Sequence, residues 1–412
     1  MNAFTPSKIL VGLVVAAFVL AGGASAFAQN GPAPTFSIDL ASPTVGTPDS
    51  FYGSPITAGD VLSGPVGGPT IGSPSLPTAS APGLVVYGGA GFPPLGPRAL
   101  FQIQGQGASA ELDALSYGRD LGQSIVFSVD GFAVGNGALP AIPNVASEGA
   151  AGAMEASADV YRDIGKLLPL GLAGALPPGL PGAVAGNTMV YDGNATASPA
   201  VPPLGLALVE FPPLSDNLDA LDIDTVAADA QGPIYYSLDS GFIDPATGAA
   251  NSNSAVANGF VGGDVIVDAG MGPAVYAAAA ALGLDMQGLD TDDLDALILN
   301  DAMGDLEFDP ANDLLLYSVR RGSAIINTLD SIWGAPIEEG DLLAPPAIGG
   351  AAPGIIIPAE WLGLATARTF GVNFGDDLVA ADLVPEPATV AMLLSAALAG
   401  LLMWTRRRRN AA

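Results

Sequence analysis

Short stretches in which apolar and polar residues alternate recur along the whole chain. Ile125, Phe127 and Val129 alternate with Val126, Ser128 and Asp130, and residues 234–239 repeat the pattern. A period of two with an aromatic residue on one face and serine on the other predicts a half-buried β-strand. Gly, Pro, Asn and Asp gather between the stretches, as turns require. The pattern therefore predicts an all-β fold made of short strands.

Four kinds of segment recur in one cyclic order, which indicates an internal repeat. The first is an aromatic residue followed by Ser, at 36–39, 127–130, 236–239 and 317–320. The second is a small residue followed by Asp and two apolar residues, at 59–62, 158–161, 263–266 and 340–343. The third is apolar, at 84–87, 189–192, 274–276 and 355–357. The fourth is acidic, at 111–115, 217–221, 293–297 and 376–380.

Four short strands in each of four units predict a four-bladed β-propeller over residues 29–383. The repeat begins on an aromatic-Ser segment and ends on the acidic segment that should precede it. We therefore expect the N- and C-terminal strands to pair, which closes the ring without a free edge. A sandwich of the same strands is the alternative. The Asp-Ala-Leu segment followed by an aromatic strand loosely resembles hemopexin-type four-bladed repeats, and this resemblance implies a similar architecture with an ion-holding central channel.

Two alanine-rich stretches depart from the strand pattern. Residues 148–166 have the composition of a helix. Residues 273–282 have it too, but we predict a strand there, because Tyr276 falls in phase with Tyr87 and Tyr191.

The N-terminus has the features of a secretory signal over residues 1–28. Lys8 gives a positive start, residues 9–20 are apolar, and Ala26-Phe27-Ala28 fits the small-x-small cleavage pattern. We predict removal by signal peptidase after Ala28, and a retained membrane anchor is the alternative.

The C-terminus, residues 384–412, carries three features in a fixed order. They are the motif Val384-Pro385-Glu386-Pro387, an apolar run over 390–404, and the basic cluster Arg406, Arg407, Arg408 and Arg409. The run predicts a hydrophobic helix that enters the membrane, with the arginines on the cytoplasmic side. This order resembles the PEP-CTERM sorting signal. The resemblance implies recognition by an exosortase-type membrane enzyme, cleavage near the motif after transient membrane anchoring, and delivery to the bacterial cell surface or exopolysaccharide matrix. A plain C-terminal anchor is the alternative.

Composition excludes several functions. The 412 residues contain no His and no Cys, which excludes a Ser-His-Asp triad, a cysteine nucleophile, a disulfide and a Cys/His zinc site. Formal net charge is −29, and residues 29–383 alone hold 40 acidic and seven basic residues, a net charge of −33. Such a polyanion is a poor partner for nucleic acid.

The acids suggest a calcium site. We predict that one acid of each acidic segment is equivalent in all four units and converges on the axis, namely Asp113, Asp219, Asp295 and Asp377. Calcium prefers such oxygen ligands, although no EF-hand pattern is present. A solvated acidic surface is the alternative, and it also accounts for the acid-rich stretches 216–229 and 285–313.

An enzyme of this composition would rely on carboxylates. Glu338, Glu339 and Glu360 lie near Trp333 and Trp361, as in a glycosidase site. However, Glu338-Glu339 aligns with Thr57-Ala58, which indicates a turn that tolerates substitution. We therefore predict a non-enzymatic protein with a structural or adhesive role. The alternative is a carbohydrate-binding or carbohydrate-active propeller.

Overall fold

The computed structural model describes most of the repeat region. The described residues are 34–50, 53, 55–64, 83–87, 103, 110–117, 125–131, 133–135, 143–149, 156–163, 187–194, 201–206, 217–223, 232–248, 250–347, 350–371 and 373–383. Both predicted signals, 1–28 and 384–412, lie outside them. Within the described part of the chain, no helix is long and apolar enough to cross a membrane.

The described strands form four antiparallel sheets of four strands each. Blade 1 contains, from the inside outward, β16 (Ala380–Leu383), β1 (Pro34–Ser37), β2 (Val61–Ser63) and β3 (Gly83–Tyr87). Blade 2 contains β4 (Ala114–Ser116), β5 (Val126–Ser128), β6 (Val160–Asp163) and β7 (Asn187–Tyr191). Blade 3 contains β8 (Leu221–Ile223), β9 (Ile234–Tyr236), β10 (Val265–Asp268) and β11 (Ala274–Ala277). Blade 4 contains β12 (Leu294–Asn300), β13 (Leu314–Val319), β14 (Leu342–Ala344) and β15 (Gly354–Ile357).

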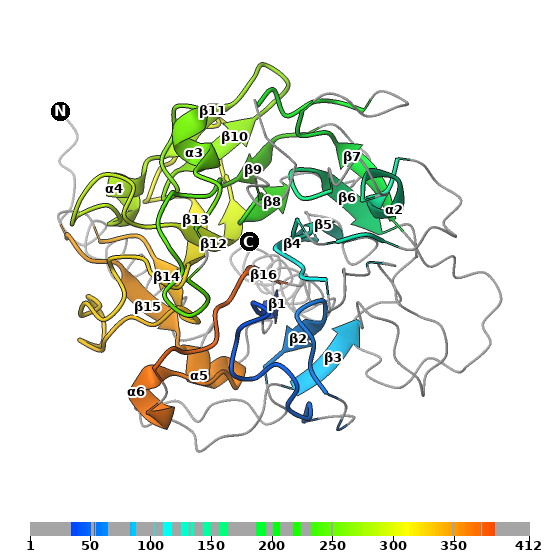
Figure 1. The fold of residues 1–412 in the computed structure, drawn as a ribbon. Coiled ribbons are helices and arrows are strands. Elements are labelled where there is room, and N and C mark those ends of the chain that lie inside the picture. The colour runs from blue at the N-terminus through cyan, green and yellow to red at the C-terminus, as the bar shows by residue number, and fades with distance from the viewer. Residues whose placement is uncertain are drawn as a thin grey trace, which may run out of the picture.

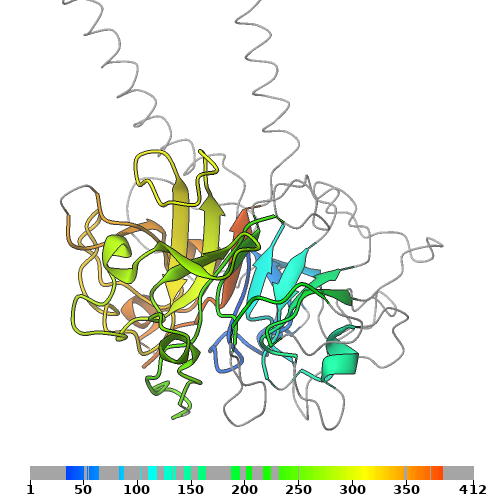
Figure 2. The same cartoon turned by 90° about the horizontal axis from the view of Figure 1, so that it is seen from above.

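The four blades surround a common centre (Figure 1). Their innermost strands contact one another in sequence, β16 with β4, β4 with β8, β8 with β12, and β12 with β16. Figure 2 shows blades 2 and 4 on opposite sides of the molecule. This arrangement is a four-bladed propeller, so the predicted all-β repeat is confirmed and the sandwich alternative is wrong.

Blade 1 combines strands from both ends of the described chain. Strand β16 pairs with β1 in antiparallel register, with Phe36 opposite Ala381 and Ser37 opposite Ala380. This is the pairing that the phase of the repeat predicted.

The apolar residues pack between neighbouring blades, and the four hydrophobic clusters correspond to the four blade interfaces. One cluster joins Val61 of blade 1 to Phe127 of blade 2, and another joins Val126 of blade 2 to Tyr236 of blade 3. The other two join blades 3 and 4, and blades 4 and 1. Successive residues of one strand thus serve two interfaces. The prediction of half-buried strands was wrong for this reason, because each blade has a neighbour on both faces and β5 is buried throughout.

The serine of the repeat links one blade to the next. Ser128, Ser237 and Ser318 donate from Oγ to the carbonyl oxygens of Leu218, Leu294 and Leu378, which lie at equivalent places at or just before the start of the next innermost strand. Ser37 instead donates to Ala58 O in its own blade. Each link satisfies a buried polar group, which explains a polar residue in an otherwise apolar interface.

Short helices lie in the connections, namely α2 (Val145–Glu148), α3 (Ser254–Ala257), α4 (Ala279–Leu282), α5 (Ala359–Leu362) and α6 (Ala367–Phe370). The recurrent Leu-Gly-Leu ends α4 and α5, where Gly283 and Gly363 adopt φ of 80° and 85° between buried leucines. The strand predicted within residues 273–282 is confirmed only for β11, and the helical composition was correct for the second half of that stretch, which forms α4. The helical composition of 148–166 was misleading, because the described residues after the end of α2 contain β6.

Candidate functional site

The register of the innermost strands corrects one predicted equivalence. Ala114, Ala296 and Ala380 each lie opposite the repeat serine of the adjacent strand. The residue before this alanine is Asp113 in blade 2, Asp295 in blade 4, and Val379 in blade 1. Asp377 therefore does not belong with the other predicted acids.

Asp377 instead occupies the position three residues before the alanine, with Glu111, Asn217 and Asp293. The backbone supports this assignment, because the carbonyl oxygens of Asp377, Glu111 and Asp293 all accept from the residue that ends the aromatic-Ser segment. The sequence comparison had made Asp377 equivalent to Asp295. In the structure Asp377 is equivalent to Asp293, and Asp376 precedes the repeated positions. The central acids thus form two layers, one with three acids and one with three acids and Asn217.

A third set of acids comes from the end of the aromatic-Ser segments. Asp39, Asp130 and Asp239 hold equivalent places there, and Arg320 takes the fourth. The recurring Asp in this segment was visible in the sequence, but it was not among the predicted ligands.

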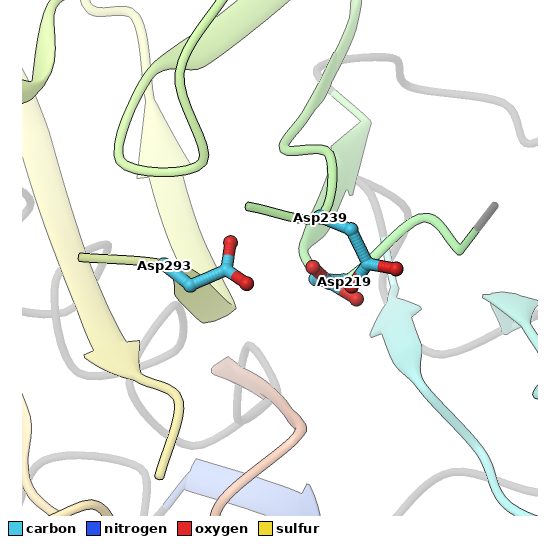
Figure 3. Close-up of side chains that lie close together, drawn as sticks. All are labelled: Asp219, Asp239 and Asp293. Atoms are coloured by element: carbon cyan, nitrogen blue, oxygen red, sulfur yellow. The ribbon is translucent and has the colours of Figure 1, made fainter. Parts of the chain in front are cut away.

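Three carboxylates from two blades converge in this region (Figure 3). Asp219 precedes β8, Asp239 follows β9, and Asp293 precedes β12. One oxygen from each lies within 4.8 Å of the others, and all three residues are buried. The structure thus brings only Asp219, of the four predicted ligands, into this trio, together with two acids that the prediction omitted.

The carboxylate of Asp293 is held by one of its oxygens. Its Oδ2 accepts from Ser240 N at 3.1 Å, from Ser240 Oγ at 3.3 Å and from Asn251 Nδ2 at 3.2 Å. Its Oδ1 has no hydrogen-bond partner. Gly262 makes room for Oδ1, because a Cβ there would lie 2.5 Å from it.

Two arginines neutralise part of the central charge. Arg320 donates from Nη1 to Asp239 Oδ1 at 2.7 Å, and the same nitrogen lies 3.9 Å from Asp219 Oδ1. Arg321 is 1% exposed and donates from Nη2 to Asp39 Oδ1 at 3.0 Å and from Nη1 to Asp244 Oδ2 at 3.4 Å. Its backbone N–H also donates to Asp377 Oδ2 at 3.0 Å.

The central acids outnumber these two cations, and their pKa values reflect it. Burial, with repulsion from neighbouring carboxylates, raises the pKa well above the ordinary range for Glu111, Asp113, Asp219, Asp293 and Asp295. Burial raises the pKa of Asp377 to about 7, although Arg321 opposes the shift. Burial lowers the pKa of Arg320, but Asp239 and Asp219 outweigh it, and the pKa lies above its ordinary value. The site therefore favours uptake of positive charge.

Three other acids of the stretch 285–313, Asp285, Asp301 and Asp313, have a different role, which is to hold turns. Asp285 accepts from the backbone N–H groups of Asp290, Thr291 and Asp292. Asp301 accepts from Gly304 N and Leu306 N, and Asp313 from Ala302 N and Asp309 N. These carboxylates replace missing backbone partners, as Asp does in turns.

The acids proposed for a glycosidase are engaged in blade 4. Glu338 accepts from Ala367 N and Arg368 N, both at 2.8 Å, and Glu339 accepts from Gly375 N at 2.7 Å. Glu360 accepts from Arg368 Nε and Nη2, each at 2.8 Å. The predicted turn is present, because Asp341 N donates to Glu338 O, but the side chains of Glu338 and Glu339 are buried in it, at 2% and 3% exposed.

The residues of the predicted sorting signal, Val384 to Pro387 and Arg406 to Arg409, lie outside the described residues. The chain matches no protein-family model, no curated protein and no solved structure.

Proposed function

We propose that the protein is a secreted, exosortase-sorted, non-enzymatic protein of the bacterial cell surface or exopolysaccharide matrix, with a structural or adhesive role. The order of Pro385-Glu386-Pro387, the apolar run and the four arginines carries the proposal, because each part suits one step of membrane insertion and cleavage. A signal at the other end is consistent with export.

The described fold suits a display role. Its blades bury apolar residues on both faces, and β1 and β16 pair with one another. The carboxyl groups of Glu338, Glu339 and Glu360 are occupied by backbone N–H groups and by Arg368. These contacts favour a structural role for the acids that a glycosidase would use.

The sorting step can be tested in the producing bacterium. Mass spectrometry of the mature protein would locate its C-terminus in strains with and without the exosortase-type enzyme. We expect cleavage near Pro385 only when the enzyme is present, and accumulation of uncleaved protein in the membrane when Glu386→Ala or Pro387→Ala is introduced. Pro353→Ala, in the propeller, is the matched control and should be processed normally. Normal processing without the enzyme would contradict the proposal.

A carbohydrate-binding role is the second candidate, and the exposed ring of Trp333 favours it. Trp333 is 47% exposed, and its Nε1 donates to Ile355 O at 2.8 Å, which fixes the ring. Leu329 and Ile332 in the same turn are 62% and 52% exposed. An aromatic ring on an apolar surface is suited to stacking on a sugar.

Co-sedimentation with the producer's exopolysaccharide tests this candidate. Trp333→Ala should weaken binding several-fold, whereas Met271→Ala, a control at a side chain that is 90% exposed in blade 3, should not. Shortening of the polysaccharide by the wild-type protein would establish an enzyme and overturn the non-enzymatic proposal.

A further inference from the structure

The trio of Asp219, Asp239 and Asp293 has the features of a cation site. Its residues come from three separate segments of the chain. Asp219 and Asp239 lie before β8 and after β9 of blade 3, and Asp293 lies directly before β12 of blade 4. The burial of all three distinguishes the trio from a solvated acidic surface, because an isolated buried carboxylate is costly without a compensating charge or hydrogen bond.

Two oxygens of the trio lack any partner. Asp219 Oδ2 and Asp293 Oδ1 are buried and accept no hydrogen bond, although the residues are only 4% and 0% exposed. Buried polar atoms are nearly always satisfied in proteins, so two such atoms in one cluster indicate an absent partner. The carboxylate of Asp293 faces the other two in Figure 3.

The surroundings hold these side chains in place. Three donors hold the Asp293 carboxylate through Oδ2, so Oδ1 remains without a hydrogen-bond partner. Asp239 is fixed through Oδ2, which accepts from Ser252 N at 3.1 Å and Ser252 Oγ at 2.6 Å. Such secondary contacts orient the ligands of metal sites.

The chemistry of the cluster favours calcium. Calcium takes six to eight oxygen ligands at about 2.3–2.6 Å in flexible geometry, whereas magnesium usually keeps several waters and is bound through one or two carboxylates. The three oxygens lie within 4.8 Å of one another. We propose that Asp219, Asp239 and Asp293 bind one Ca²⁺ ion, which joins blade 3 to blade 4, with water completing the coordination.

The positive charge of Arg320 weakens cation binding at this site. Its guanidinium contacts Asp239 Oδ1 and lies near Asp219, so it supplies a positive charge where the ion would add two more. The repulsion between Arg320 and the ion places the site in the weak range of extracellular calcium modules, with a dissociation constant of about 10⁻⁴ to 10⁻³ M.

Isothermal titration of the chelator-treated protein with CaCl₂ tests the site. We expect one ion per chain, a rise in melting temperature with calcium, and binding at least tenfold weaker for Mg²⁺. Asp293→Asn and Asp219→Asn should each weaken calcium binding at least tenfold, and Arg320→Gln should strengthen it by about tenfold. Asp305→Asn removes the same charge from a loop beyond the opposite end of β12 and should leave binding unchanged.

The outcomes are distinguishable from those of the sorting experiment, which does not involve these residues. Equal weakening by Asp305→Asn would show a diffuse counterion atmosphere and overturn the site. Absence of binding at 10 mM CaCl₂, or unchanged binding by folded Asp293→Asn protein, would also overturn it. Magnesium binding of equal strength would overturn the choice of calcium.

Discussion

The buried side chain of Arg321 and the partly exposed Asp39 form an ion pair that joins the last blade of the repeat to the first. The Nη2 atom of Arg321, just after β13, lies 3.0 Å from Asp39 Oδ1, just after β1. The same guanidinium lies 3.7 Å from Asp377 Oδ2, just before β16. One side chain thus contacts the segments that flank both strands of the pairing between the chain's ends.

Replacement of Arg321 should weaken this closure. Arg321→Met removes a buried cation from several carboxylates, and loss of one partner from a buried ion pair costs about 3–5 kcal/mol. We expect a lower free energy of unfolding, measured with urea, and faster amide hydrogen exchange in β1 and β16.

Arg320→Met is the matched control for this change. Arg320 contacts Asp239 and Asp219 of blade 3, so its loss should not selectively speed exchange in β1 and β16. Equal exchange in the two variants would contradict a specific role for Arg321 in closing the ring.

The serine links between blades should each contribute to stability. Ser318→Ala removes the Oγ donor that lies 2.7 Å from Leu378 O and leaves a buried carbonyl unsatisfied, at a cost of about 1–3 kcal/mol. Ser237→Ala should behave alike, because Ser237 donates to Leu294 O. Ser331→Ala, at an exposed position, should change the urea midpoint little. Full stability of Ser318→Ala would show that the link contributes nothing.

The fold was predictable from the sequence because its signals are local and repeated. Phe36-Ser37 and Tyr317-Ser318 each identify the second strand of a blade, and the phase of the repeat predicts the pairing of β1 with β16. The hydrogen-bond partners of the repeat serines could not be predicted in this way. Ser128 donates to the neighbouring blade, and no pattern within one segment identifies that acceptor.

The candidate site was predicted only in part, because it depends on which atoms converge from different blades. Asp219 was found through the acidic segment, but Asp239 belongs to another segment and Asp293 lies two residues before the predicted Asp295. The placement of Asp377 failed because adjacent acids allow two alignments. The recurring Asp after the aromatic-Ser strand was the signal that could have found Asp239.

Gly262 should tolerate no side chain. A Cβ at this position would lie 2.5 Å from Asp293 Oδ1, 2.7 Å from Ser240 Cβ and 2.9 Å from Ser240 N, and the last contact is with backbone. Overpacking of this kind costs about 1–3 kcal/mol. Gly262→Ala should therefore lower the melting temperature and displace Asp293. A crystal structure of the variant with Asp293 in place would contradict this expectation.

Glu338 should make stability depend on pH. Burial raises its pKa from 4.5 to about 7, so the folded state retains a proton that the unfolded state loses between these values. Proton release on unfolding means that the contribution of Glu338 to the free energy of unfolding falls as pH rises from about 4.5 to about 7. Many other buried acids also titrate, so the quantity to measure is the difference between wild type and Glu338→Gln. The free energy of unfolding of wild type minus that of Glu338→Gln should fall as pH rises over that interval and become constant above it. A difference that is constant from pH 4.5 to 8 would show that Glu338 titrates normally.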